Sequence, residues 1–299
     1  MHCLSNEIKE RVYVERKAFS TFDLESADGG EGVSMINSQQ TALIKKDIRA
    51  VTSNKRLFSV ILIVPLFMTV VLPAIFIAIA GRADINSSDI QDMVTAFGIP
   101  EHIFGTDLRE FIIRMIMNDV IPLFFLMIPI LTSTTMAASS FIGEKEKRTL
   151  ETLLYSPLSI KQIFDAKVVA SMVLSLLVSL GSFVLMILVT QSLVWIFIGR
   201  FISMGWNWLI LLLLVSPGMS LIAIAFIVRG SAKAQSVEES QQRSAFLVIP
   251  ILLLIIMQFS GLQIVSVWVM LVGGLICLIS GYLFARRISL RFSYEKLLL

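Results

Sequence analysis

Six long stretches without a charged side chain constrain the fold of this chain more than any other feature. They are Leu57–Ala80, Val120–Ile142, Val168–Val189, Trp206–Val228, Ala245–Gly261 and Ile264–Ala285. A helix needs about 20 mostly apolar residues to cross the hydrocarbon core of a bilayer. The chain is 56% hydrophobic and 16% charged, which is less charge than ordinary soluble domains carry. We therefore predict an all-α integral membrane protein with six transmembrane helices.

The positions of lysine and arginine predict the orientation of these helices, because cytoplasmic loops of membrane proteins are enriched in both residues. With the N-terminus in the cytoplasm, 17 of the 25 Lys and Arg residues fall in inner segments. Only 4 fall in outer loops, namely Arg82, Arg109, Arg114 and Arg200, and the other 4 lie in the first 38 residues. We expect a multi-pass protein of the cell membrane with both termini in the cytoplasm.

Residues 1–38 carry mixed charges and lack the apolar core of a signal peptide. We predict a disordered cytoplasmic tail there and a second cytoplasmic tail over residues 288–299. An alternative hypothesis for the start of the chain is that translation begins at Met35. N-terminal sequencing of the native protein tests this hypothesis, and a chain that starts at Met1 contradicts it.

The segment Gln39–Arg56 has the pattern of an amphipathic helix before the first span. Its apolar residues recur at helical spacing, and cations lie between them: Leu43, Ile44, Ile48 and Val51 alternate with Lys45, Lys46 and Arg49. Such a helix suits the inner membrane interface, with its apolar face among acyl chains and its cations near anionic headgroups. The alternative is a positively charged flank that only sets the topology.

The charged segment between the second and third stretches also has a helical pattern. Leu150, Leu153 and Leu154 form a narrow apolar stripe. Glu144 and Arg148 carry opposite charges four residues apart, which stabilises an exposed helix slightly. A solvated loop does not need a leucine stripe, so the pattern favours a surface that binds another protein.

A corner is predicted where this segment meets the third stretch. The residue before Pro157 avoids the helical region, so the first helix ends there. Ser159 and Gln162 form a capping box that begins a new helix, and Leu158 with Ile163 matches a hydrophobic staple. We expect this corner to join the charged helix rigidly to the third span.

The sequence GEKEKRTLETLLYSPLS at residues 143–159, followed by Ile163 and Lys167, resembles the coupling-helix region of ABC type-2 permeases. These are the membrane subunits of ATP-binding-cassette exporters. The basic segment before the first span and the six-span order are similar to the same family, so the resemblance covers about residues 39–287. It implies a connecting helix at 39–56, a six-span transmembrane domain at 57–287, and a cytoplasmic coupling helix at 144–155 between spans two and three. It also implies that an ATPase docks on Glu144, Glu146, Arg148, Leu150, Glu151, Leu153, Leu154 and Pro157.

The resemblance also implies the function of a permease subunit, which is not itself an enzyme, in an ATP-driven exporter that works by alternating access. ATP and Mg²⁺ belong on a separate cytoplasmic ABC ATPase, because this chain has no GXXXXGK[ST] phosphate-binding loop and hence no cofactor site. Twelve spans per transporter require a second copy of this permease or a related one. The expected substrate is an amphipathic antimicrobial, a peptide or a lipid-like compound.

Three other functions compete with this one. Residues 231–244 are similar to permeases grouped with sodium-extruding and antimicrobial-exporting systems, which makes sodium an alternative substrate. An ATP-independent channel or carrier is less favoured, because ion coupling usually requires charged residues within the spans and the six stretches contain none. An intramembrane enzyme is disfavoured because the spans offer hydroxyl groups without a base.

Hydroxyl residues of the second stretch are candidates for lining the translocation pathway: Thr132, Thr134, Thr135 and Ser139. The alternative is close helix packing, to which small and hydroxyl residues are suited. His2, His102, Cys3 and Cys277 are isolated, so no metal site is expected, and a net charge of +3 does not indicate a nucleic-acid partner.

The loops outside the membrane carry two further predictions. Residues 88–98 have the pattern of a short helix on the outer surface, beginning with a capping box at Ser88 and Gln91. Spans five and six are predicted to form a hairpin with its turn at residues 260–263. This turn leaves little room for the re-entrant helices that many permeases of the family place there.

Overall fold

The computed structural model divides the chain into two units, Met1–Asn37 and Ser38–Leu299. It describes residues 38–82, 108–147, 149, 158–231, 234, 236–259 and 266–291, all of which belong to the second unit. Every regular element in these ranges is a helix, and none of the described residues forms a strand. The predictions for both tails beyond these ranges, for the helix at 88–98 and for the turn at 260–263 lie outside the described residues.

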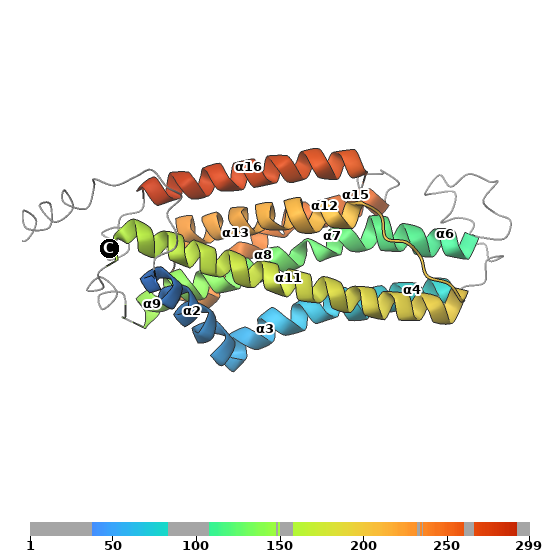
Figure 1. Ribbon diagram of the computed structural model, residues 1–299, viewed down its shortest axis with the longest axis horizontal. Helices are drawn as coiled ribbons and strands as arrows, with labels where there is room; N and C mark the ends of the chain where they lie inside the picture. The colour runs from blue at the N-terminus through green and yellow to red at the C-terminus, as the bar shows by residue number, and fades with distance from the viewer. Residues whose placement is uncertain are drawn as a thin grey trace, which may run out of the picture. The chain divides into compact units, whose positions relative to one another are not determined.

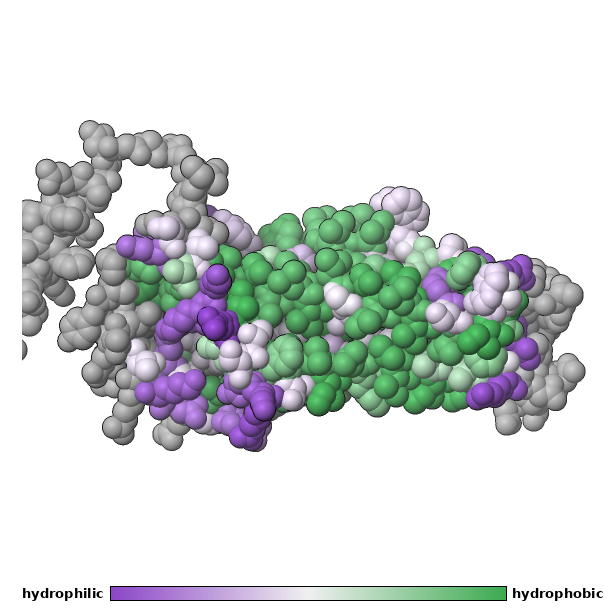
Figure 2. Space-filling view, turned by 60° about the horizontal axis from the view of Figure 1, so that its bottom comes forward, coloured by the Kyte–Doolittle hydropathy of each residue, from purple (hydrophilic) through white to green (hydrophobic). Residues whose placement is uncertain are grey.

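Six helices in the described ranges are long and apolar enough to cross a membrane, as the sequence predicted. They are Lys55–Arg82, Arg109–Glu146, Ile160–Ile198, Asn207–Ser231, Val237–Gln258 and Val267–Ser289. Figure 2 shows a broad apolar surface over the middle of the bundle and hydrophilic side chains toward both ends. An apolar band of this kind is the surface that a bilayer requires.

Most spans consist of several helical elements joined end to end. Span one comprises α3 (Lys55–Leu66), η1 (Phe67–Val71) and α4 (Leu72–Arg82). Span two comprises α6 (Leu108–Met115), η3 (Ile116–Val120), α7 (Ile121–Phe125), α8 (Met127–Ala137), η4 (Ala138–Ile142) and α9 (Gly143–Glu146). Span three is α11 (Ile160–Ile198), and span four comprises α12 (Asn207–Ile210), η5 (Leu211–Val215) and α13 (Ser216–Ser231). Span five comprises α14 (Val237–Ser244), η6 (Ala245–Leu247) and α15 (Ile249–Phe259), and span six is α16 (Val267–Arg291).

The helix α2 (Ser38–Ser53) precedes span one and lies beside α9 at one end of the bundle (Figure 1). We call this end the α2 end, and the opposite end, where α6 lies, the α6 end. The buried face of α2 carries Leu43 and Val51, which pack against Ile163 of α11 and Ile61 of α3 respectively. The apolar face predicted to lie among acyl chains therefore packs on protein, because helical spacing alone does not distinguish the two kinds of apolar partner.

The third span differs most from its predicted bounds. The prediction began the span at Val168 because charged residues precede it, but α11 begins at Ile160 and includes Lys161, Asp165 and Lys167. The predicted capping box is present, since the Ser159 hydroxyl accepts from the Gln162 N–H at 3.3 Å and the Gln162 side chain accepts from the Ser159 N–H at 2.9 Å. The charged N-terminal turns thus continue the span as one helix.

Wide π turns interrupt three spans just before a proline. The turns η1, η3 and η5 each end two residues before a proline: Pro73, Pro122 and Pro217. Proline has no N–H, and its ring clashes with the carbonyl four residues earlier, so a regular α turn is unfavourable there. Widening the preceding turn accommodates the proline without breaking the helix.

Packing within the bundle centres on α8, α11 and α13. The helix α11 lies along α8 and α2, while α13 packs against both α8 and α16. A side chain at Gly218 of α13 would place a Cβ atom 2.7 Å from the backbone nitrogen of Leu278 in α16. Backbone atoms cannot move aside as a flexible side chain can, so only glycine permits this close approach.

Candidate functional site

The predicted docking residues fall partly within the described structure. Glu144 and Glu146 lie in α9 at the α2 end. The other predicted docking residues lie outside the described residues: Arg148, Leu150, Glu151, Leu153, Leu154 and Pro157. The helix predicted over 144–155 is therefore described only over Gly143–Glu146, after which Lys147 forms a turn. The site can be built from the residues that surround this first turn.

Glu144 is buried although it is charged, and each of its carboxylate oxygens pairs with a different lysine. Its Oε1 lies 3.2 Å from Nζ of Lys46 in α2, and its Oε2 lies 2.9 Å from Nζ of Lys167 in α11. The Lys46 side chain is 58% exposed, whereas that of Lys167 is 1% exposed. Glu144 therefore joins three segments, with one partner in solvent and the other in the interior.

Lys167 is the centre of this arrangement. Its ammonium group donates to the backbone carbonyl of Ser140 at 2.6 Å and also lies 3.4 Å from Oδ2 of the buried Asp47. The Ser140 hydroxyl donates to the same Asp47 oxygen. An ammonium group has three N–H donors. The carbonyl and the two carboxylates supply an acceptor for each of them. We call Lys46, Asp47, Ser140, Glu144 and Lys167 the charge cluster.

The charge cluster is formally neutral, because two ammonium groups face two carboxylates. A buried charge is tolerated only when it is paired and hydrogen-bonded. Phe141, whose ring centroid is 5.6 Å from Nζ of Lys167, adds a favourable cation–π contact on an otherwise apolar side. The cluster therefore meets the conditions for stable burial of charge at a boundary between apolar packing and the hydrophilic end of the bundle.

Helical spacing explains how the sequence brings these residues together. Asp47 lies between Leu43 and Val51 at intervals of four residues, so it shares their buried face of α2. On α11, Lys167 follows Ile163 by four residues and lies on the same buried face. The signal available from the sequence was a charged residue within an apolar stripe. The prediction named the apolar members of the α2 stripe and missed Asp47, and it counted Lys167 among loop cations.

Glu146 connects the same turn to the second loop at the α2 end. Its Oε2 accepts from the backbone N–H of Val237 at 3.1 Å, which is the first residue of α14. A carboxylate is favourable at a helix N-terminus, where unpaired N–H groups carry partial positive charge. The turn Gly143–Glu146 is therefore held by α2 and α11 on one side and by α14 on the other.

The candidate pathway residues lie in α8 and η4, inside the protomer. The hydroxyl groups of Thr132, Thr134 and Thr135 each donate to a carbonyl three or four residues earlier in α8, and all three residues are buried. Ser139 in η4 is half-buried. Within one chain these positions act in helix packing, and a role in lining a path remains a prediction about the assembled transporter.

A second buried polar group lies in the middle of the bundle. The Ser175 hydroxyl of α11 donates to the carbonyl of Pro129 at 3.0 Å, accepts from Thr132 at 3.1 Å, and lies 2.9 Å from the hydroxyl of Ser220 in α13. We call Thr132, Ser175 and Ser220 the hydroxyl layer. It joins α8, α11 and α13 without any charge.

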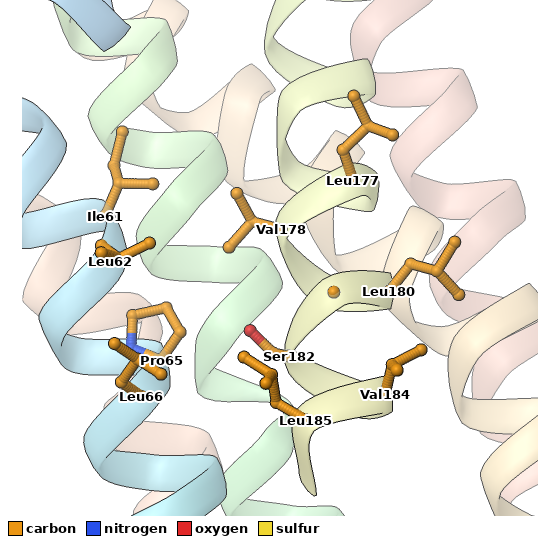
Figure 3. A pocket seen from close by; sticks show the side chains of 11 residues that line it. Ile61, Leu62, Pro65, Leu66, Leu177, Val178, Leu180, Ser182, Val184 and Leu185 are labelled. Atoms are coloured by element: carbon orange, nitrogen blue, oxygen red, sulfur yellow. The ribbon is translucent and has the colours of Figure 1, made fainter. Parts of the chain in front are cut away.

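An apolar groove of about 560 Å³ separates α3 from α11 (Figure 3). One wall is Ile61, Leu62, Pro65 and Leu66, and the other wall includes Leu177, Val178, Leu180, Val184 and Leu185. Ser182 is the one polar side chain among the lining residues. A groove with these walls suits a hydrocarbon chain and offers little to an ion.

Comparison with known proteins gives one family. A family model described as "ABC-2 family transporter protein" matches residues 41–274, which is most of the 299-residue chain. A comparison with curated proteins gives no match. The matched range includes most of α2, the whole charge cluster and the first five spans.

Proposed function

Because the chain belongs to the ABC-2 family of transporter proteins, we propose that it is the permease of an exporter driven by a separate ATPase. ABC-2 permeases lack ATPase activity themselves and generally pair with an ABC ATPase. In our proposal, that ATPase is cytoplasmic, carries ATP and Mg²⁺, and binds the segment Glu144–Leu154. Two copies of the permease, or this chain with a related one, complete the transporter.

The observation that carries this proposal is the attachment of the turn Gly143–Glu146 to the spans. Glu144 reaches α11 and α2 through Lys167 and Lys46, and Glu146 reaches α14. A force applied to the exposed part of the segment thus has a direct route into the bundle. A loop that merely connected two spans would not need buried ion pairs at its first turn.

The orientation is part of the proposal. We place the α2 end in the cytoplasm, because Lys and Arg are concentrated in the segments that lie there, and the exposed face of α2 carries Lys45 and Arg49. An ATPase in the cytoplasm then meets the segment directly. Cysteine accessibility tests this: Lys147→Cys is expected to react with an impermeant maleimide only in inverted vesicles, and labelling in right-side-out cells contradicts it.

The mechanism that we propose is alternating access. ATP binding closes the two ATPase subunits and draws the two Glu144–Leu154 segments together. The corner before Ser159, where α11 begins, passes that movement to spans two and three. Hydrolysis and release of the ATPase pair return the bundle to its first state.

The substrate class that we propose is amphipathic or lipid-like, such as an antimicrobial compound or peptide. Its support is the apolar groove between α3 and α11 and the absence of charged side chains from the six predicted stretches. Stimulation of ATP hydrolysis in proteoliposomes by a long-chain alkyl amphiphile, but not by Na⁺, is the expected result. If Na⁺ stimulates ATP hydrolysis and the amphiphile does not, the result contradicts an amphipathic substrate and supports sodium extrusion.

The central test is co-purification in mild detergent from the native membrane, followed by mass spectrometry. We expect an ABC ATPase in near-equal amount. Combining Leu150→Asp with Leu154→Asp is expected to lower its recovery at least tenfold, because losing one buried leucine contact already costs roughly 1.5–3 kcal/mol. Thr149→Asp, an exposed position outside the leucine stripe, is the matched control. Retention of the ATPase by the double variant contradicts the docking assignment, and recovery of the chain alone points to an ATP-independent channel or carrier.

A further inference from the structure

We infer that Lys167 is a positioning residue that makes the docking turn, α2 and span three move as one body during transport. The inference rests on the proposed function, because it concerns how movement of the docked ATPase reaches the spans. Its basis is the charge cluster, in which the buried ammonium group of α11 contacts α2 through Asp47 and the end of span two through Ser140 and Glu144.

The contacts of Lys167 are of a kind that fixes relative position. The ammonium group lies 2.9 Å from Glu144, 2.6 Å from the carbonyl of Ser140, and 3.4 Å from Asp47. Separating any one segment from the others leaves a buried charge without its partner. Buried unpaired charges are strongly unfavourable, so the three segments are held together more firmly than apolar contacts alone would hold them.

Stability alone does not account for the cluster. Apolar residues of similar volume often replace buried ion pairs without loss of stability. The Phe141 ring lies 5.6 Å from the ammonium group, and Ile163 and Ala170 are buried on the adjoining turns of α11, so an apolar side chain at this position would have apolar neighbours. Apolar contacts, however, tolerate sliding, whereas hydrogen-bonded charges specify one arrangement. The cluster therefore fixes the positions of α2, α9 and α11 relative to one another.

Glu144 has a second lysine that behaves differently. Its pair with Lys46 is open to solvent on the lysine side, so it can break and re-form at little cost. Its pair with Lys167 cannot do so. The exposed pair can therefore open without separating the three elements, and the buried pair is the one that holds them together.

The test measures distances between spin labels on α2, α9 and α11 in the complex with the ATPase. The chain has two cysteines, Cys3 and Cys277, which are first replaced by serine. Labels are then placed at exposed positions as two pairs, Ala42→Cys with Lys147→Cys and Ala42→Cys with Lys161→Cys. Each pair is measured without nucleotide and after trapping with ATP and vanadate.

In the otherwise unchanged protein, both distances are expected to stay within about 2 Å between the two states, less than a subunit-scale rearrangement. The decisive variant combines Lys167→Met with Asp47→Asn, which removes one charge of each sign and leaves Glu144 paired with Lys46. It is expected to keep the bound ATPase and its ATP hydrolysis, while the distance distributions broaden and shift between states. The single variant Lys167→Arg, which keeps the positive charge, is expected to give distributions as narrow as those of the unchanged protein. A general effect on folding would not explain this difference between the arginine variant and the double variant.

Two results overturn the inference. Distances that change independently in the unchanged protein show that the segments do not move as one body, and this result does not depend on whether any variant folds. Narrow, unchanged distances in the double variant show that Lys167 is not needed. Absence of a bound ATPase before any labelling is instead a failure of the proposed function, so the two are distinguishable.

Discussion

The charge cluster and the hydroxyl layer both join α11 to span two, but by opposite chemical means. Lys167 and Ser175 lie two turns apart on the buried face of α11, and each reaches across to span two. Near the α2 end the contact uses full charges, and in the middle of the bundle it uses neutral hydroxyl groups. Charge in the middle of a bilayer is expensive, whereas a hydroxyl can always bond a carbonyl of its own helix.

The difference indicates at which of the two positions the bundle tolerates the loss of a polar side chain. Ser175 bonds three polar groups, namely the carbonyl of Pro129 and the hydroxyls of Thr132 and Ser220. If its hydroxyl is removed, Thr132 and Ser220 still bond carbonyls of their own helices. Among the described residues, removing Lys167 leaves the buried Asp47 with the Ser140 hydroxyl as its remaining side-chain partner. The charge cluster thus provides a firm, specific contact near the α2 end, and the hydroxyl layer provides a weaker, adaptable contact within the apolar core.

The largest expected effect is that of Lys167→Met. Leaving Asp47 unpaired in the interior is expected to lower the free energy of unfolding by about 3–5 kcal/mol. The measurement is thermal unfolding in detergent, followed by size-exclusion fluorescence. Adding Asp47→Asn is expected to recover most of the loss, because the buried charge is then gone. If Lys167→Met is as stable as the unchanged protein, the charge cluster does not hold the helices more firmly than the hydroxyl layer does.

A smaller effect is expected for Ser175→Ala. Hydrogen bonds between membrane helices contribute about 0.6 kcal/mol on average and at most about 1.7 kcal/mol, so the loss should lie in that range. Ser192→Ala serves as the control, because its hydroxyl is exposed and bonds the carbonyl of Leu188 in its own helix. A loss for Ser175→Ala as large as that for Lys167→Met would mean that the hydroxyl layer, not the charge, carries the specific contact.

The smallest effect is expected for Lys46→Ala. Its ammonium group pairs with Glu144 from the solvent side, and exposed ion pairs contribute about 0–1 kcal/mol. The same measurement on Arg56→Ala, which loses a pair with Glu238 that is exposed on both sides, should show still less. Raising the salt concentration should remove the effect of Lys46→Ala and leave that of Lys167→Met, because buried pairs are little screened.

The sequence predicted six spans and the family. The described residues form six helices long and apolar enough to cross a membrane, and the family model confirms the family. Absence of charge over 17 or more residues is a strong signal, so the existence of each span was readable. The capping box at Ser159 correctly predicted where α11 begins, but the burial of Lys167 was not readable, because a hydropathy pattern ends at Lys167 whether that lysine enters solvent or meets two carboxylates. Only the fold brings Asp47 and Glu144 to it from 120 and 23 positions away in the chain.

The π turns were equally hidden in the sequence. The prolines of the spans are visible in the sequence, and a proline in a membrane helix is compatible with either a hinge or an ordinary bend. The structure adds that Pro73, Pro122 and Pro217 each follow a widened turn. No residue type specifies such a turn by itself, since η5 consists of four leucines and a valine. Its position depends on the proline beyond it and on the neighbouring helices.

These widened turns give the spans a built-in unit of displacement. A π turn holds one residue more than the α turn that it replaces. If the turn at Leu211–Val215 closed to regular α-helix, α13 would advance along its axis by about 1.5 Å and rotate by about 100° relative to α12. Ser220 would then leave Ser175 and a different face of α13 would meet α11. The bundle thus carries, inside single helices, a screw-like step that changes which side chains face one another without unfolding any span.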